Sequence, residues 1–225
     1  MSMILEDWGN YRGVSLRRII GTRAYSYVAS HVALDADGSP RAYHPQNQGI
    51  DANANAGFPG GGWRNVLAVD PADKTKPFVQ TAGPTNGFFV CKTSLRDSTR
   101  AESDIAAYVN SETIPYIVFP GKFYRMSGTG KYGDLAMVRS ADGKRDSAAI
   151  VADGGPSEAD LGEMSLALAT ALGGNAPNPR NGKGAPKGPI RYVIFPGSAS
   201  SPAWPRAWAE IDATARALLA AQGGW

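Results

Sequence analysis

The sequence is short of the residues that build metal centres and disulfide frameworks. It has one cysteine, Cys91, and two histidines, His31 and His44, among 225 residues. A single cysteine excludes a disulfide within the chain, and a zinc site of thiolates and imidazoles is not expected. A free cysteine in an apolar run is usually a small buried side chain. We therefore expect no metal, no cofactor, and a fold that depends on core packing.

Long hydrophobic runs and a strong surplus of one charge are also missing. The first thirteen residues carry acids and no apolar run behind basic residues, unlike a secretory signal or a membrane span. The net charge is +3 and the basic residues are scattered, so nucleic-acid binding is not indicated. We expect no membrane partner, and secretion or delivery out of the cytoplasm only by a route without an N-terminal signal peptide.

Glycine and proline are abundant, and they fall between short apolar runs. The 27 glycines and 16 prolines indicate many turns. Residues 16–34 are typical of a hairpin, followed by a turn at 35–38 that lacks the later ligands of a calcium loop. Further strands are expected at 88–92, 116–119, 135–139, 148–151 and 192–195. Short, evenly spaced strands predict a mainly β fold, as a barrel or a sandwich.

Two helices are predicted. Ser165 is a suitable N-cap for a helix over 166–172, which Gly173 would end. A second helix over 205–222 has an apolar face. Because no repeat or linker divides the chain, we predict a single domain over 1–225, with the C-terminal segment 202–222 packed on the rest.

An irregular stretch from 43 to 69 is a candidate substrate-binding wall. Its glycines and prolines preclude a continuous helix or a central strand. Tyr43, His44 and Trp63 are interleaved with amides, and aromatic faces can stack on sugars while amides bind hydroxyls. The same pattern also suits aromatic residues that hold the loop against the core, and a surface role for His44.

The most informative segment runs from 135 to 174 and contains two acids, Asp153 after an apolar strand and Glu163 before a helix start. Glycoside hydrolysis needs one protonated carboxyl group and one ionised one, about 6.5–9.5 Å apart in inverting enzymes. Desolvation would raise the pKa of Asp153, and helix N–H groups would keep Glu163 ionised. This predicts Asp153 as acid and Glu163 as base, with the reverse assignment open. A turn-forming Asp153 and a capping Glu163 are the alternatives.

This segment resembles the core of double-psi β-barrels, in which an Asp-x-Gly-Pro turn precedes an acid-hydrophobe-Ser helix start, as in expansins and family 45 glycosidases. The chain more closely resembles the family 75 chitosanases, over residues 31–198. The matching pieces, in order, are DADG at 35–38, KTSL at 92–95, IPYIVFPG at 114–121, YGDLA at 132–136, VADGGP at 151–156, GEMS at 162–165 and YVIFPGS at 192–198.

The resemblance implies a double-psi β-barrel with a few helices packed outside, and Asp153 and Glu163 as the essential carboxylates. Tyr132 and Asp134 lie in one matching piece. They are candidate substrate-binding residues, although a turn role for Asp134 is equally compatible with the sequence. The resemblance implies no cofactor.

The function implied by the resemblance is endo-acting, inverting hydrolysis of a β-1,4-linked amino-sugar polysaccharide, chitosan first, by a monomer. The pI of about 9.0 is better matched to an anionic polymer. A peptidoglycan glycan-strand hydrolase, acting as a lytic factor or an antibacterial toxin, is therefore the close alternative, although a local acidic cleft would suit chitosan. A non-catalytic carbohydrate-binding barrel is the alternative from another class.

Overall fold

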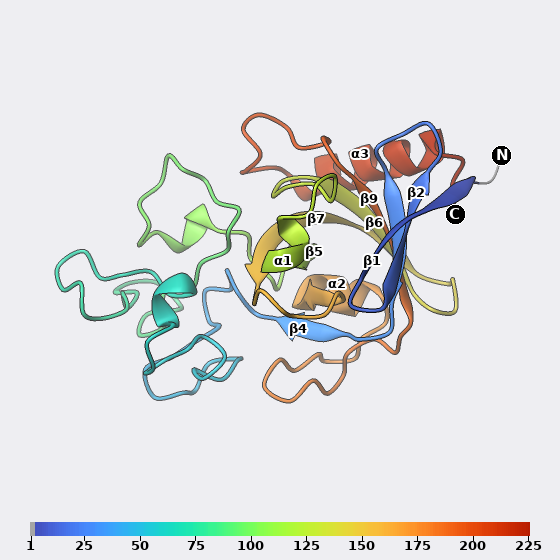
Figure 1. Cartoon of the computed structure of the whole chain (residues 1–225). Helices are drawn as coiled ribbons and strands as arrows, with labels where there is room; N and C mark the ends of the chain where they lie inside the picture. Colours follow the sequence, from blue (N-terminus) through green and yellow to red (C-terminus); the bar gives the residue numbers. More distant parts are fainter. Residues whose placement is uncertain (1–2) are drawn as a thin grey trace.

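A single nine-stranded mixed sheet forms the centre of the molecule, shown by a computed structural model that describes residues 3–225 (Figure 1). The strand order is β1-β2-β3-β9-β6-β7-β5-β8-β4. The strands are β1 (Leu5–Tyr11), β2 (Val14–Ile19), β3 (Tyr25–Ala29), β4 (Ala33–Asp35), β5 (Tyr116–Pro120), β6 (Leu135–Arg139), β7 (Asp146–Gly155), β8 (Glu163–Ser165) and β9 (Ile190–Phe195).

The mainly β class is confirmed, but the predicted closure into a double-psi barrel is wrong. Strands β1 and β4 form the two ends of the sheet order, and they do not pair with each other. Evenly spaced apolar runs indicate where strands occur, but closure depends on pairing between the first and last strands of the order. That pairing is a long-range property, and the local pattern does not contain it.

Most predicted strands lie within observed ones. The ranges 116–119, 135–139, 148–151 and 192–195 fall in β5, β6, β7 and β9. Residues 88–92 differ, because they form isolated bridges with Leu67 and Val79 instead of a strand. Strand β1 was not predicted. Its largely polar sequence becomes a strand by antiparallel pairing with β2.

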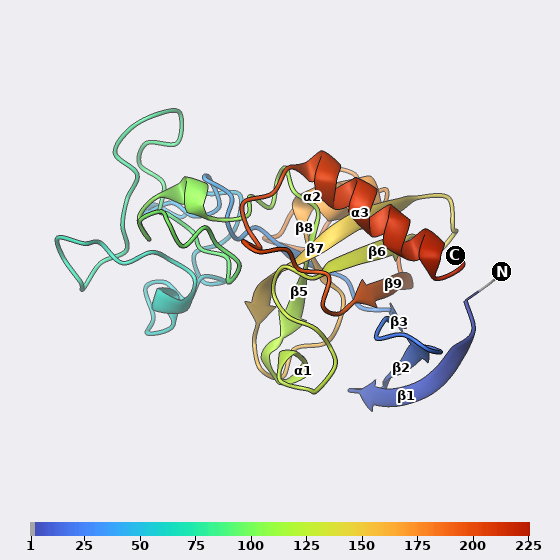
Figure 2. The ribbon, with the colours of Figure 1, turned by 90° about the horizontal axis from the view of Figure 1, so that it is seen from above.

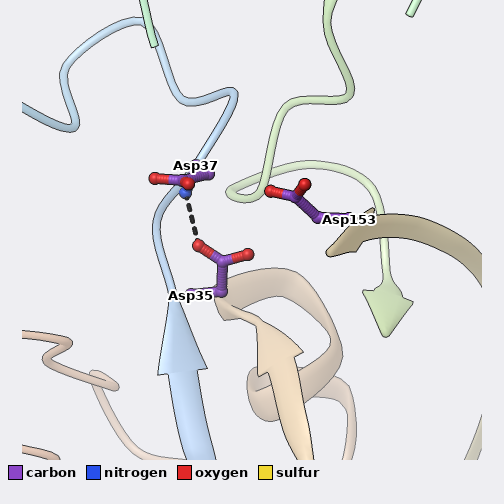
Figure 3. A group of neighbouring side chains, drawn as sticks. All are labelled: Asp35, Asp37 and Asp153. Atoms are coloured by element: carbon purple, nitrogen blue, oxygen red, sulfur yellow. Dashed lines mark hydrogen bonds between the residues drawn. The ribbon is translucent and has the colours of Figure 1, made fainter. Parts of the chain in front are cut away.

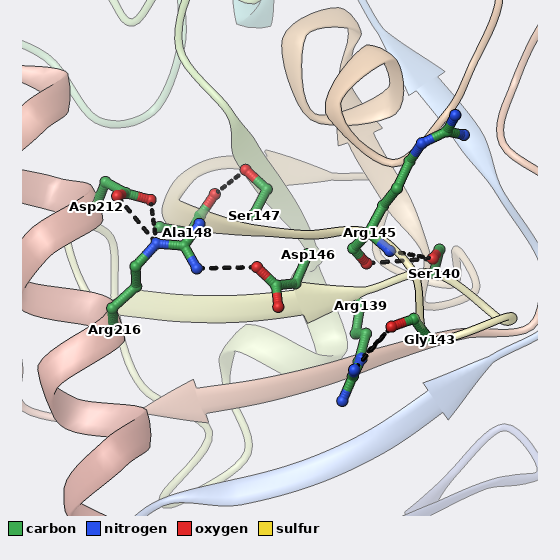
Figure 4. A network of polar contacts seen from close by, with 9 residues as sticks. All are labelled: Arg139, Ser140, Gly143, Arg145, Asp146, Ser147, Ala148, Asp212 and Arg216. Carbon is green, nitrogen blue, oxygen red and sulfur yellow. Dashed lines mark hydrogen bonds and ion pairs between the residues drawn. The ribbon is translucent and has the colours of Figure 1, made fainter. Parts of the chain in front are cut away.

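The helices are few, as predicted: α1 (Gly121–Tyr124), α2 (Leu166–Ala171) and α3 (Trp208–Ala221), with 3-10 turns η1 (Trp63–Asn65) and η2 (Ile105–Ala107). The Ser165 hydroxyl accepts the N–H of Leu168, which confirms the predicted cap of α2. Helix α3 lies along β6 and β7 (Figure 2). Arg216 on α3 donates to Asp146 at the start of β7, at 2.9 Å (Figure 4). Among residues 3–225, no helix is long and apolar enough to cross a bilayer.

Residues 36–114 form a group of loops beside the sheet with little regular secondary structure (Figure 1). These loops have an apolar cluster of their own, which includes Tyr43, Trp63, Leu67 and Phe89. Burial of this cluster stabilises an irregular backbone against the β4–β5 side of the molecule. The loops therefore supply an ordered surface next to strands β4 and β5.

Candidate active site

Asp153 lies at a bulge near the C-terminal end of β7. In the parallel pair of β5 and β7, Ile117 is opposite Val151 and Val118 is opposite Asp153, so Ala152 has no partner on β5. A bulge interrupts the regular alternation of side chains and redirects the residues beside it. The irregularity that positions Asp153 therefore lies inside a buried strand, where the frame around it is rigid.

Glu163 and Asp35 come from two neighbouring parallel strands. Glu163 begins β8 opposite Ala33, and Asp35 ends β4 opposite Ser165. Met164, between Glu163 and Ser165, packs in the core. Since adjacent residues of a strand point to opposite faces, Glu163 is directed away from that core. The parallel register thus brings Asp35 and Glu163 to one side of the sheet.

Asp35, Asp37 and Asp153 form a compact group of carboxylates (Figure 3). One oxygen from each lies within 4.8 Å of the others. The Asp37 N–H donates to Asp35 at 2.8 Å. Burial, followed by repulsion from neighbouring acids, raises the pKa of Asp35 and Asp37 well above the usual range. These groups therefore resist simultaneous ionisation.

The Asp153 carboxylate receives its hydrogen bonds on one oxygen. Oδ1 accepts the backbone N–H of Ser94 at 2.9 Å, the Ser94 hydroxyl at 2.6 Å and the N–H of Gly154 at 2.7 Å. Within residues 3–225, no donor is bonded to Oδ2. Burial raises the pKa of Asp153, and these hydrogen bonds oppose the rise because they favour the charged form.

The Glu163 carboxylate, in contrast to that of Asp153, lies among groups that do not favour its charged form. No protein group of residues 3–225 donates a hydrogen bond to its carboxylate. Burial, then the negative charges of Asp153 and Asp51, raise the pKa of Glu163 to about 7. The expectation that helix N–H groups keep Glu163 ionised is wrong, since Ser165 takes the capping position of α2.

These acids line a cavity of about 780 Å³ between the sheet and the loops. One side, the sheet wall, consists of Val118, residues 153–157 and Glu163, and the other side, the loop wall, consists of lining residues between 34 and 66. Among the described residues that line the cavity, none is lysine or arginine. Five lining residues are acidic: Asp35, Asp37, Asp51, Asp153 and Glu163. Because no basic side chain of the described lining offsets these acids, the cavity is negative wherever any of them is ionised, and this complements a cationic ligand.

Of the predicted aromatic contacts, only Tyr43 lines this cavity. Its hydroxyl is bonded to Asp37 at 2.9 Å and to Asp51 at 3.2 Å, so it links two acids of the loop wall. Trp63 is buried in the loop core, and His44 stands edge-on against Phe88. Neither lines the cavity, and both positions agree with aromatic residues that hold the loops together.

Tyr132 and Asp134 also lie outside the cavity lining. Tyr132 stacks on Tyr124, with ring centroids 4.2 Å apart, and its hydroxyl lies against Gly154. Asp134 is fully buried, and its two oxygens accept backbone N–H groups at 2.8, 2.9 and 2.9 Å from Lys131, Gly197 and Ala199. This closed arrangement joins two chain segments and leaves no oxygen of Asp134 directed at the cavity.

Four residues of the site were not predicted as functional: Asp35, Asp37, Asp51 and Ser94. The DADG motif at 35–38 predicts a turn, and the chain does form a turn there. Ser94 lies in the KTSL piece, 59 residues before Asp153. Only the resemblance drew attention to these pieces, because no local pattern connects residues so far apart in the chain.

A comparison with protein families finds one match. The family model described as fungal chitosanase of glycosyl hydrolase group 75 matches residues 79–220. The matched range contains the whole sheet wall, with Asp153 and Glu163, but it excludes the lining residues of the loop wall, which all lie before residue 67. A search of curated proteins finds no match to the chain.

Proposed function

Because the chain belongs to the fungal chitosanase family of glycosyl hydrolase group 75, we propose that it cleaves chitosan within chains, in the acidic cavity. Membership makes the protein a glycoside hydrolase and implies chitosan hydrolysis.

The observation that carries the substrate assignment is the charge of the cavity. Its lining has five acids and, among residues 3–225, no basic side chain. Chitosan carries ammonium groups that such a field attracts, whereas the lactyl carboxylates of peptidoglycan would be repelled. The charge of the site therefore supports chitosan over peptidoglycan, despite the basic pI of the whole chain.

The environments of the two acids support one assignment of roles. Glu163, with a pKa of about 7 and no donor, keeps its proton in weakly acidic solution and is suited to be the general acid. Asp153 accepts three hydrogen bonds that favour its ionised form, and its Oδ2 is free to take a proton from water. This is the reverse of the assignment favoured by the sequence.

The proposed reaction is a single inverting displacement. Glu163 gives its proton to the glycosidic oxygen as the bond from that oxygen to the anomeric carbon breaks. A water attacks the anomeric carbon from the opposite face, and Asp153 accepts the proton that the water loses. Proton exchange with solvent then returns Glu163 to the acid form and Asp153 to the carboxylate.

The test is product analysis on two polymers. The wild type, Asp153→Asn and Glu163→Gln are each incubated with chitosan and with purified peptidoglycan. Oligosaccharides from chitosan that disappear in both variants, and that first form with the α anomeric configuration, are expected. Cleavage of peptidoglycan alone would show that the substrate is the bacterial cell wall and would contradict the chitosan assignment. Binding of chitosan without cleavage would favour a non-catalytic carbohydrate-binding protein.

We also propose that the enzyme acts as a monomer outside the cytoplasm, since its polymeric substrate lies there. Light scattering tests the first statement, and a mass above that of one 23.7 kDa chain would contradict it. Cell fractionation tests the second.

A further inference from the structure

Ser94 is held beside Asp153 by its two neighbours in the chain. The N–H of Leu95 donates to Ala152, in β7, at 2.8 Å. The Thr93 hydroxyl donates to the Leu95 carbonyl at 2.7 Å and accepts the N–H of Val109 at 3.0 Å. Ser94 itself is exposed, but the backbone on both sides of it is anchored. Its position relative to Asp153 therefore does not depend on the serine side chain.

The proton of the Ser94 hydroxyl can be assigned from its partners. The oxygen lies 2.6 Å from Asp153 Oδ1 and 3.2 Å from the nitrogen of Gly154. The Gly154 N–H is only a donor, so the hydroxyl accepts from it and gives its own proton to Asp153. A short hydrogen bond from a hydroxyl to a carboxylate is of the stronger, charge-assisted kind.

We propose that Ser94 is a positioning residue for the general base: its hydroxyl and N–H hold Asp153 ionised, with Oδ1 occupied and Oδ2 free for the attacking water. This proposal rests on the proposed function, because it presumes that Asp153 is the base. Two donors from one residue fix the orientation of the carboxylate as well as its charge.

Most groups that face Asp153 do not stabilise its ionised form, so the hydrogen bonds from Ser94 are needed. Those that interact with its charge are acids and phenols: Asp35, Asp37, Glu163, Tyr116 and Tyr132. The acids oppose ionisation of Asp153, and no lysine or arginine of residues 3–225 lines the cavity to offset them. Burial raises the pKa of Asp153, and the Ser94 hydroxyl is the largest influence that lowers it.

The experiment is the pH dependence of kcat/KM for Ser94→Ala on chitosan. The base must be ionised, so activity is lost as pH falls through the pKa of Asp153. Removal of a donor to the carboxylate raises that pKa. The acidic limb of the pH profile, in which kcat/KM falls as pH decreases, should therefore move up by about one pH unit. Below the limb, activity should fall about tenfold, while the alkaline limb stays in place. Because the amines of chitosan titrate equally for both proteins, the difference between the curves belongs to the enzyme.

Two further variants sharpen the test. Ser94→Thr keeps the hydroxyl and should return the acidic limb toward the wild-type position. Ser94→Cys places a weak donor at the same site and should give an intermediate shift. It also provides the measurement if Ser94→Ala does not fold, as judged by thermal melting. A merely structural serine would lower the melting temperature in the variants and leave the limb where it is.

Asp153→Asn, measured in parallel, separates the two proposals. If it is inactive and the acidic limb of the Ser94 variants is unchanged, the role of Ser94 is refuted while the catalytic pair stands. If Asp153→Asn keeps wild-type activity, the proposed function itself fails at this residue. A shifted limb in Ser94→Ala that Ser94→Thr restores, together with an inactive Asp153→Asn, supports both.

Discussion

Two cavities of this molecule have opposite charge. The acidic cavity lies between the sheet wall and the loop wall, and a second cavity of about 560 Å³ opens beside β2 and β3. The second cavity is lined by Arg12, Arg17 and Arg191, with Asp160 as its one acid among the described residues. Arg12 is paired with Asp160 at 2.7 Å. The basic pI of the chain therefore coexists with a site suited to a cation, because the two signs of charge are separated in space.

The net charge of a protein governs its solubility and long-range attraction, whereas a bound substrate responds to the local field. At physiological ionic strength, charges more than about 8 Å apart are largely screened from each other at the surface. A cationic sugar inside the acidic cavity is thus influenced mainly by the carboxylates around it. Variants in and around each cavity test this separation.

The largest effect is expected from the proposed catalytic pair, Asp153 and Glu163. Asp153→Asn and Glu163→Gln should each lower kcat on chitosan about a thousandfold, because each removes a proton-transfer group. Glu158→Gln is the matched control. Glu158 is an exposed acid paired with Lys122 at 2.8 Å, and it does not line the acidic cavity. If the control loses as much activity as the pair, negative charge alone, and not proton transfer, would explain the loss.

A smaller effect is expected where Arg180 supports the loop wall. Its guanidinium donates to the carbonyls of Asn47, Gly49 and Asp51, the last two at 3.1 Å. Arg180→Ala removes these bonds, and we expect KM for chitosan to rise several-fold, equivalent to about 1 kcal/mol, with kcat within twofold. Arg180→Lys, which lacks the planar fork, should be intermediate. An unchanged KM would mean that the loop wall keeps its shape without this contact.

Asp51 should have a small influence on the alkaline limb of activity, the pH range in which activity falls as pH rises. Glu163 must be protonated to act as acid, so activity is lost as pH rises through its pKa of about 7. The charge of Asp51 raises that pKa, and Asp51→Asn should move the alkaline limb down by a few tenths of a pH unit. The pH profile of kcat/KM measures this. A limb that moves upward instead would contradict the assignment of Glu163 as the acid.

The smallest effect is expected at the basic cavity. The double variant Arg17→Ser and Arg191→Ser removes two charges from its lining. At physiological ionic strength, kcat/KM on chitosan should stay within twofold of the wild type, because the substrate is screened from these charges. A tenfold change in either direction would show that the two cavities are not electrostatically independent.

Sequence reasoning succeeded where a property is local. The cap at Ser165, the strand β6 and the helix α3 follow from residues that are neighbours in the chain. Strand β1 was missed because its polar sequence forms a strand only through its partner β2. The DADG turn was identified, but the approach of Asp35 and Asp37 to Asp153 depends on a sheet order in which β4 follows β8 and β5.

The sequence by itself determined the positions of β5, β6, β7 and β9 and the cap of α2, and its family motifs pointed to Asp153 and Glu163 as candidates. Only the tertiary structure decided that the sheet stays open, that three more acids lie beside the pair, and which acid accepts hydrogen bonds. The pKa of a carboxyl group depends on burial, on donors and on neighbouring charges. For Asp153 one donor residue is Ser94, and for Glu163 a neighbouring charge is Asp51, so long-range folding sets both environments.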